Sequence, residues 1–127
     1  MDCSARKKVL LIESDQDLRA GVTDLLEMEG YQAISTSCYQ EALKHLALSD
    51  PPEVIIFDCV PPCGSGEEFL LGLKKLGHLS EIPVLLMFSD STIKRKYAQS
   101  GVTGFIKKPL DIESFLVVVE KYALYRG

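Results

Sequence analysis

The sequence lacks the features that mark membrane, secreted and nucleic-acid-binding proteins. Its apolar runs end after five or six residues, whereas about 20 are needed to span a bilayer. No charged segment followed by an apolar stretch and a small-residue cleavage site opens the chain, which argues against secretion. The net charge of −4 leaves no basic surplus for nucleic acid. We therefore expect a cytoplasmic protein that binds neither a membrane nor nucleic acid directly.

The chain also lacks a cysteine pattern typical of disulfides or metal sites. Its four cysteines show no paired spacing, which favours reduced thiols in a cytoplasm. Cys59 and Cys63 are separated by three residues rather than two, and no histidine lies near them. Free thiols in a turn are therefore a better interpretation of this pair than a metal or redox site.

The length and composition are those of one ordinary globular domain. The chain has 127 residues, of which 46% are hydrophobic and 25% charged, enough for one core and too few for two. No repeat, linker or low-complexity stretch interrupts it. We expect residues 1–127 to form a single domain.

The most informative stretch is Val54-Ile55-Ile56-Phe57-Asp58. Four consecutive apolar residues rich in β-branching predict a strand buried on both faces, as in a parallel sheet. Pro61 and Pro62 must end the strand, because neither can donate to a sheet ladder. Asp58 is thus predicted at the carboxyl end of a central strand, although an aspartate that merely opens a turn is a common alternative.

The rest of the chain repeats a strand–helix unit five times. Strands are predicted at residues 9–12, 32–36, 54–58, 84–88 and 103–107, each followed by a segment of helical periodicity. Such alternation requires a parallel sheet with helices on both faces. The simplest arrangement is an α/β fold with a doubly wound five-stranded sheet in the flavodoxin-like order 2-1-3-4-5.

Helix ends and buried faces can also be predicted. Capping residues are expected at Ser14 or Asp15, Ser37 (with Gln40), Ser65 (with Glu68) and Asp111, and Gly30 should end the first helix in a left-handed conformation. The fourth helix, residues 92–100, is weak, with Ile93, Tyr97 and Ala98 facing inward. The last helix should pack on the sheet through Ile112, Phe115, Leu116 and Val119.

Polar side chains follow four of the predicted strands, and parallel strands end at one edge of a sheet. That edge gathers Glu13, Ser14, Asp15, Asp58, Ser89 and Lys108. The group suits phosphoryl transfer onto a carboxylate, with Asp58 as the nucleophile. Mg²⁺ would bridge the acids and the phosphoryl oxygens, Lys108 would add a positive charge, and the Ser89 hydroxyl could donate a hydrogen bond.

These residues make the chain resemble the receiver domains of bacterial two-component response regulators over nearly its whole length. The matching features are Glu13 after the first strand, Asp58 followed by Pro62 and Gly66, Ser89 after the fourth strand, and Lys108-Pro109. The resemblance implies that Asp58 accepts a phosphoryl group from a sensor histidine kinase or a phosphotransfer protein. It further implies that Ser89 and Phe105 change position as a switch and that the Lys108–Pro109 peptide is cis.

The metal site departs from the family pattern. The family usually has two adjacent acids after the first strand, but Ser14 follows Glu13 here. Asp15 could reach the site or only cap a helix. We expect Mg²⁺ to bind weakly through Asp58, Glu13 and the backbone carbonyl of Val60.

The switch position is ambiguous from the sequence. The stretch from Ser89 to Gly101 is a few residues shorter than expected for the family. Phe88 rather than Ser89 could therefore stand at the switch position, and the fourth helix should be short.

Three functions from different classes fit the sequence to different degrees. The first is a phosphorylatable switch that turns over no separate substrate. The second is a degenerate receiver that binds proteins independently of phosphorylation, which Ser14 favours. The third is a flavin-binding redox module of the same topology, but the acidic stretch 13–17 would repel a flavin phosphate.

The resemblance also predicts an interaction surface. It is formed by the fourth helix, the fifth strand and the fifth helix and includes Lys94, Lys96 and Phe105. Val117, Val118 and Tyr122 give the outer side of the last helix an apolar character, and we expect Val118 and Tyr122 to face outward. This face should meet a downstream protein target or a second copy of the chain in a two-fold dimer. No output domain follows the last predicted helix, so the chain acts alone or belongs to a longer protein.

Overall fold

The computed structural model describes residues 6–48, 50–58 and 65–124. Its elements are, in order, β1 (Lys8–Ile12), α1 (Gln16–Met28), β2 (Gln32–Thr36), α2 (Tyr39–Leu48), β3 (Val54–Asp58), α3 (Gly66–Lys74), the 3₁₀ helix η2 (Gly77–Glu81), β4 (Val84–Phe88), α4 (Ser91–Tyr97), β5 (Gly104–Lys107) and α5 (Ile112–Leu124). The predicted strands are confirmed to within one residue, whereas η2 was not predicted.

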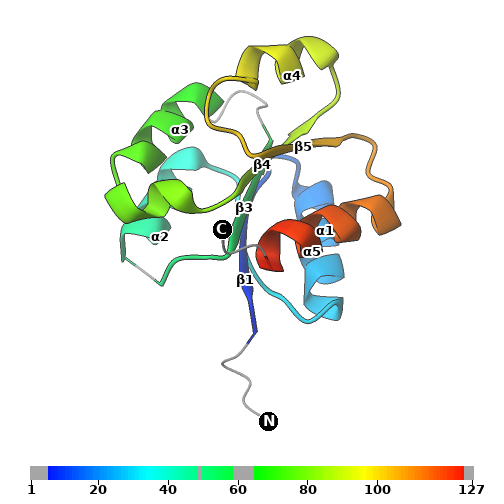
Figure 1. Ribbon diagram of the computed structural model, residues 1–127. Helices are drawn as coiled ribbons and strands as arrows, with labels where there is room; N and C mark the ends of the chain where they lie inside the picture. The colour runs from blue at the N-terminus through cyan, green and yellow to red at the C-terminus, as the bar shows by residue number, and fades with distance from the viewer. Residues whose placement is uncertain (1–5, 49, 59–64, 125–127) are drawn as a thin grey trace.

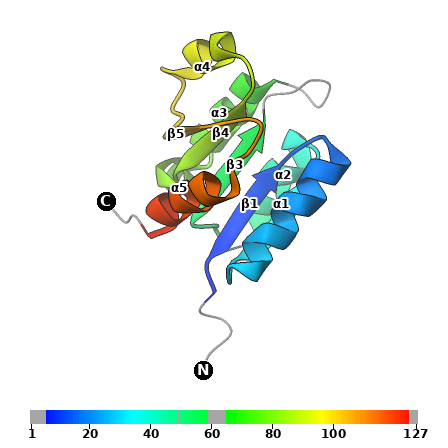
Figure 2. The ribbon, with the colours of Figure 1, turned by 90° about the vertical axis from the view of Figure 1, so that its right-hand side faces the viewer.

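All five strands are parallel, in the order β2-β1-β3-β4-β5. Helices α1 and α5 cover one face of the sheet and α2 and α3 the other, while α4 lies beside one end of the sheet (Figures 1 and 2). This is the predicted doubly wound α/β fold with flavodoxin-like strand order.

The central strands carry two hydrophobic cores, one on each face. Every residue of β3 and β4 is buried, and alternate side chains point to opposite faces. Leu10, Ile12, Ile55, Phe57 and Leu86 pack with α2 and α3. Val9, Leu11, Ile56, Leu85 and Met87 pack with α1 and α5. Asp58 ends β3, and by strand alternation it lies on the same face as Ile56. It pairs with Met87 of β4.

Several helix ends form as predicted. The Asp15 carboxylate caps α1 by accepting from the Leu18 N–H at 3.0 Å, and Gly30 follows the helix with φ of +96°. Ser65 caps α3, and Asp111 accepts from the Ser114 N–H at 3.0 Å. The capping box at Ser37 is wrong, because α2 begins at Tyr39 and Gln40 Oε1 accepts from the Cys38 thiol instead.

The predicted faces of two helices need correction. The stripe of α5 that meets the sheet is centred on Phe115, Val119 and Ala123, while Ile112 is 58% exposed as the first helical residue. Ala98 is exposed because α4 already ends at Tyr97.

Val118 and Tyr122 also differ from the prediction that they face outward. Both are half-buried and pack against the core on the α1 and α5 face. For Tyr122 the reason lies in β5. A Cβ atom at Gly104 would come within 3.2 Å of the Tyr122 ring, so the absence of a side chain there makes room for it.

Candidate functional site

Three strands place charged side chains at the carboxyl edge of the sheet. Glu13 directly follows β1, Asp58 is the last residue of β3 and Lys108 directly follows β5. Strands β1 and β3 are neighbours, with Ile12 opposite Phe57, so the next residue of each strand carries one of the two acids. The predicted convergence of these side chains is confirmed.

The Lys108 ammonium joins the two acids. Its Nζ donates to Asp58 Oδ2 at 2.9 Å and to Glu13 Oε1 at 3.1 Å. The acids are almost fully enclosed, with 1% of Glu13 and 6% of Asp58 exposed. We call Glu13, Asp58 and Lys108 the carboxylate–lysine cluster. Charge-assisted hydrogen bonds of this kind are strong when water is excluded.

Burial and the hydrogen bond between Asp58 and Lys108 act in opposite directions on the pKa values of these two groups. Burial raises the pKa of Asp58, and the neighbouring Glu13 raises it further, while the bond to Lys108 works against both. Burial would lower the pKa of Lys108, but its hydrogen bond and attraction to Asp58, with help from Glu13, raise it above the usual value. The lysine therefore stays protonated at neutral pH and compensates the buried negative charge.

Asp15 does not reach the cluster with its carboxylate. Its Oδ1 is used to cap α1, while its backbone N–H donates to Glu13 Oε2 at 3.0 Å. The Glu13 backbone is held in turn, because its carbonyl accepts from Arg19 at 2.8 Å. The sequence left both roles of Asp15 open, and the structure selects the cap.

The cluster fits a cation, although its ligand set is small. Glu13 and Asp58 already direct one oxygen each at the same ammonium. Among the described residues, no group of three or more His, Cys, Asp or Glu side chains could hold a metal ion. Mg²⁺ commonly uses one or two carboxylates plus substrate phosphate, so this pair is a sufficient protein contribution. Val60 lies outside the described residues.

Comparison with known proteins decides the family. The family model "Response regulator receiver domain" matches residues 9–120. The chain belongs to this family. The receiver domain is also 30% identical over 118 residues to the polar-differentiation response regulator DivK of Brucella ovis, covering 91% of this chain and 95% of DivK.

Solved structures agree with this assignment. The chemotaxis response regulator CheY4 of Vibrio cholerae matches with a TM-score of 0.83 and 25% identity, over 93% of this chain and 99% of that one. The receiver domain of the sensor histidine kinase PA1611 from Pseudomonas aeruginosa shares the fold, with a TM-score of 0.84 over 94% of this chain and 98% of that one. It is 15% identical and is described with a magnesium ion coordinated in its active-site cleft.

The predicted switch residues of this receiver domain lie on β4 and β5 or directly after β4. Phe88 is the last residue of β4, and its ring meets that of Phe105 edge-on, with centroids 6.1 Å apart. Lys94 Nζ lies 5.7 and 5.6 Å from the two ring centroids. Ser89 is exposed, one residue beyond the strand.

The segment after β5 is held beside β4. The Lys108 backbone N–H donates to the Phe88 carbonyl at 2.7 Å, and the Lys108–Pro109 peptide is cis as predicted. This backbone hydrogen bond therefore connects Lys108 of the cluster to the end of β4, where the loop to α4 begins.

One buried residue beside Asp58 was missed. The Tyr39 hydroxyl donates to the Asp58 backbone carbonyl at 2.7 Å. Tyr39 lies three and seven residues before Ala42 and Leu46, on the same buried face of α2. This spacing could have indicated burial, but nothing in the sequence indicates the carbonyl as its partner.

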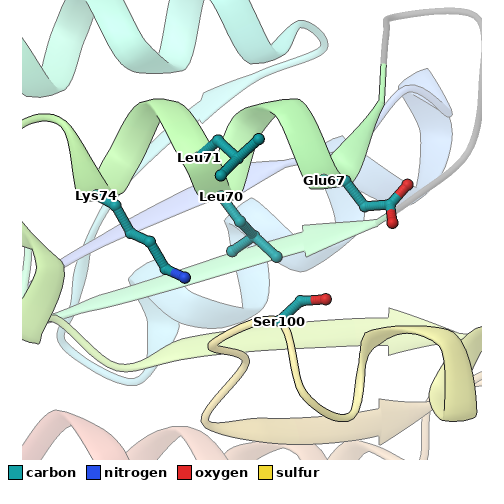
Figure 3. A pocket seen from close by; sticks show the side chains of 5 residues that line it. All are labelled: Glu67, Leu70, Leu71, Lys74 and Ser100. Atoms are coloured by element: carbon teal, nitrogen blue, oxygen red, sulfur yellow. The ribbon is translucent and has the colours of Figure 1, made fainter.

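A concave region lies away from the cluster. A shallow groove of about 220 Å³ runs beside α3 and is lined by Glu67, Leu70, Leu71, Lys74 and Ser100 (Figure 3). It shares no residue with the carboxylate–lysine cluster and has no part in the chemistry proposed below.

Proposed function

We propose that this receiver domain, acting as one unit over residues 1–127, accepts a phosphoryl group on Asp58. The donor would be a sensor histidine kinase or a phosphotransfer protein. The observation that supports this most is the enclosed Asp58 carboxylate, held by Lys108 beside Glu13 at the carboxyl edge of the sheet. Open α/β sheets bind their ligands at this edge.

The transfer would use the residues of the cluster in distinct roles. An Asp58 carboxylate oxygen attacks phosphorus, the bond from phosphorus to the donor breaks, and the donor keeps that electron pair. The product is an aspartyl phosphate. Lys108 then pairs with the phosphoryl oxygens, since a flexible ammonium can follow the charge that leaves the carboxylate. The protein acts as a switch and turns over no separate substrate.

Intact-mass spectrometry after incubation with acetyl phosphate and Mg²⁺ tests this function. The protein should gain one phosphoryl group. If it gains none while keeping its fold, the degenerate receiver that Ser14 favours becomes the better interpretation.

The metal would be held by Glu13 and Asp58, with the Val60 carbonyl as a further proposed ligand. Mg²⁺ would neutralise charge on the transferred group. Ser14 follows Glu13 where the family usually has a second acid, and it is half-buried. With one carboxylate fewer than the usual set, the affinity for Mg²⁺ should be low.

Replacing Ser14 tests this account of the metal. Ser14→Asp should tighten Mg²⁺ binding on the order of tenfold, because ligand charge tunes affinity for hard cations. Titration calorimetry of wild type and variant measures the effect. Ser35→Asp adds the same charge at an exposed position of β2 and should change little. Equal affinities for wild type and Ser14→Asp would contradict the proposed placement of the metal.

We propose Ser89 as the hydroxyl donor to the phosphoryl group and Phe105 as the aromatic that responds. Strand alternation supports this, because Leu85 and Met87 share the face on which Asp58 ends β3, and residue 89 continues that series. Phe88 belongs to the opposite series, against Phe105. The alternative in which Phe88 occupies the switch position stays open.

The proposed interaction face combines α4, β5 and the solvent side of α5. It would bind a downstream protein target or a second copy of the chain. On α5, Val117 is 65% exposed and Leu124, seven residues later on the same side, is 61% exposed. Val117 was already among the predicted apolar residues of this surface, and Leu124 takes the place of the half-buried Val118 and Tyr122.

The predicted cytoplasmic location stays a prediction. Within the described residues, no helix is long and apolar enough to cross a membrane.

A charge at Val117 tests the proposed face. Val117→Lys should weaken self-association by about tenfold, since a lysine at an apolar contact must be desolvated. Sedimentation over a concentration range, with and without a phosphoryl analogue, measures it. Met28→Lys adds the same charge at an even more exposed apolar residue of α1 and serves as control. A wild type that stays monomeric throughout would rule out the dimer.

A further inference from the structure

Tyr39 links α2 to the backbone of the proposed phosphoacceptor. It is the first residue of α2 and is 3% exposed. Its hydroxyl donates to the Asp58 carbonyl at 2.7 Å, and this hydrogen bond is buried. The bond joins residues that are 19 positions apart in the chain.

The tyrosine ring has little freedom to leave this position. It stacks on Phe69 of α3 with centroids 5.4 Å apart and an interplanar angle of 21°. It also meets the edge of Phe57, the residue before Asp58, at 6.3 Å and 68°. Because two packed rings set its orientation, the hydroxyl is directed at the end of β3 without further ordering.

The start of α2 is anchored as well. The Cys38 N–H donates to Thr36 Oγ1 at 3.3 Å, and Thr36 lies opposite Ile12 in the β1–β2 pairing. The Glu13 N–H donates to the Thr36 carbonyl at 3.0 Å. Tyr39 is thus tied to the same edge of the sheet that carries the cluster.

The Asp58 carbonyl lies where strand pairing with β1 ceases. The register of β1 and β3 ends with Ile12 opposite Phe57, one residue before Asp58. A hydrogen bond to this carbonyl restricts rotation about the Asp58 Cα–C bond. It thereby restricts the orientation of the whole residue, including the carboxylate that meets Lys108 at 2.9 Å.

We propose that Tyr39 is a positioning residue for phosphoryl transfer. By holding the Asp58 carbonyl, it keeps the carboxylate in contact with Lys108 and aligned for attack on phosphorus. This inference rests on the proposed function of Asp58. Misalignment of a reacting group by a fraction of an ångström is enough to slow a reaction substantially.

The variant Tyr39→Phe isolates the hydrogen bond, because the ring that packs on Phe57 and Phe69 is retained. Tyr97→Phe is the matched control. Tyr97 is also 3% exposed and also meets the edge of Phe57, with centroids 6.2 Å apart. Both variants lose a hydroxyl from the same aromatic cluster, but Tyr39 is the residue bonded to the Asp58 carbonyl.

Two measurements are made at a temperature at which denaturation curves show every variant to be folded. The first is the exchange rate of the Lys108 ammonium protons by NMR, which reports the contact with Asp58 and does not require phosphorylation. The second is the rate of phosphoryl uptake from acetyl phosphate. Tyr39→Phe should speed the exchange and slow the uptake by about tenfold. Tyr97→Phe should leave both close to wild type.

Each outcome decides the matter. A Lys108 exchange rate in Tyr39→Phe equal to that of wild type overturns the inference, as does equal slowing of uptake by Tyr97→Phe, which would assign the effect to general packing. Lower stability with unchanged exchange and uptake would show a purely structural role. If wild type takes up no phosphoryl group, the proposed function fails, and the Lys108 exchange still decides the role of Tyr39.

Discussion

Asp58→Asn should take up no phosphoryl group from acetyl phosphate and Mg²⁺ under conditions in which the wild type gains one. An amide oxygen has almost the shape of the carboxylate oxygen but lacks its charge, so the variant loses the nucleophile while keeping the volume. Because Asp58 is 6% exposed and borders the core, a substitution of equal size is needed to keep the packing. Intact-mass spectrometry measures the loss.

Asp111→Asn is the control for this experiment. It makes the same chemical change at an exposed residue that caps α5, and asparagine caps helices as well as aspartate does. This variant should gain the phosphoryl group like wild type. Uptake by Asp58→Asn would contradict the assignment. Peptide mapping would then show whether Glu13, the other buried acid of the cluster, is the acceptor.

Removing the positive charge of the cluster should have the largest effect on stability. Lys108→Met leaves Glu13 and Asp58 buried side by side without their shared ammonium. Breaking a fully buried ion pair costs about 3–5 kcal/mol. Since the Lys108 side chain is 16% exposed, we expect the free energy of unfolding at pH 7 to fall by about 2 kcal/mol.

The loss should depend on pH in a defined direction. Burial already raises the pKa of Asp58 above its unfolded value. A group of this kind stabilises the fold fully below its unfolded pKa and loses that contribution as the pH rises through its folded pKa. Without Lys108 the Asp58 carboxylate should resist ionisation more strongly, because the hydrogen bond that lowers its pKa is lost. The destabilisation by Lys108→Met should therefore shrink as the pH falls and Asp58 becomes protonated.

Urea denaturation of wild type and Lys108→Met between acidic and neutral pH measures this dependence. Lys107→Met is the matched control, because it removes the same charge from the adjacent, exposed residue of β5. It should change stability by no more than about 0.5 kcal/mol. If both variants lose equal stability, or if the loss at Lys108 grows on acidification, the cluster does not have the energetic role inferred from its geometry.

Local patterns in the sequence were sufficient for the elements and for most of the cluster. Apolar runs at Val9–Ile12, Val54–Phe57 and Val84–Phe88 predict buried parallel strands, and such strands end at a common edge. The convergence of Glu13, Asp58 and Lys108 follows from this topology, because each residue directly follows or ends a strand. Caps such as Asp15 depend on neighbours a few residues away.

The details that tertiary packing decided all involve partners distant in sequence. Helical spacing identifies Tyr39 as buried, but the Asp58 carbonyl becomes its partner because α2 packs beside the end of β3. The sequence predicts that Tyr122 faces solvent, whereas in the fold its ring packs beside Gly104 of β5. Phe88, Phe105 and Lys94 form one contact only when β4, β5 and α4 come together. Periodicity records which residues prefer to be buried, whereas the choice of partner depends on which elements lie side by side and on the volume their side chains leave.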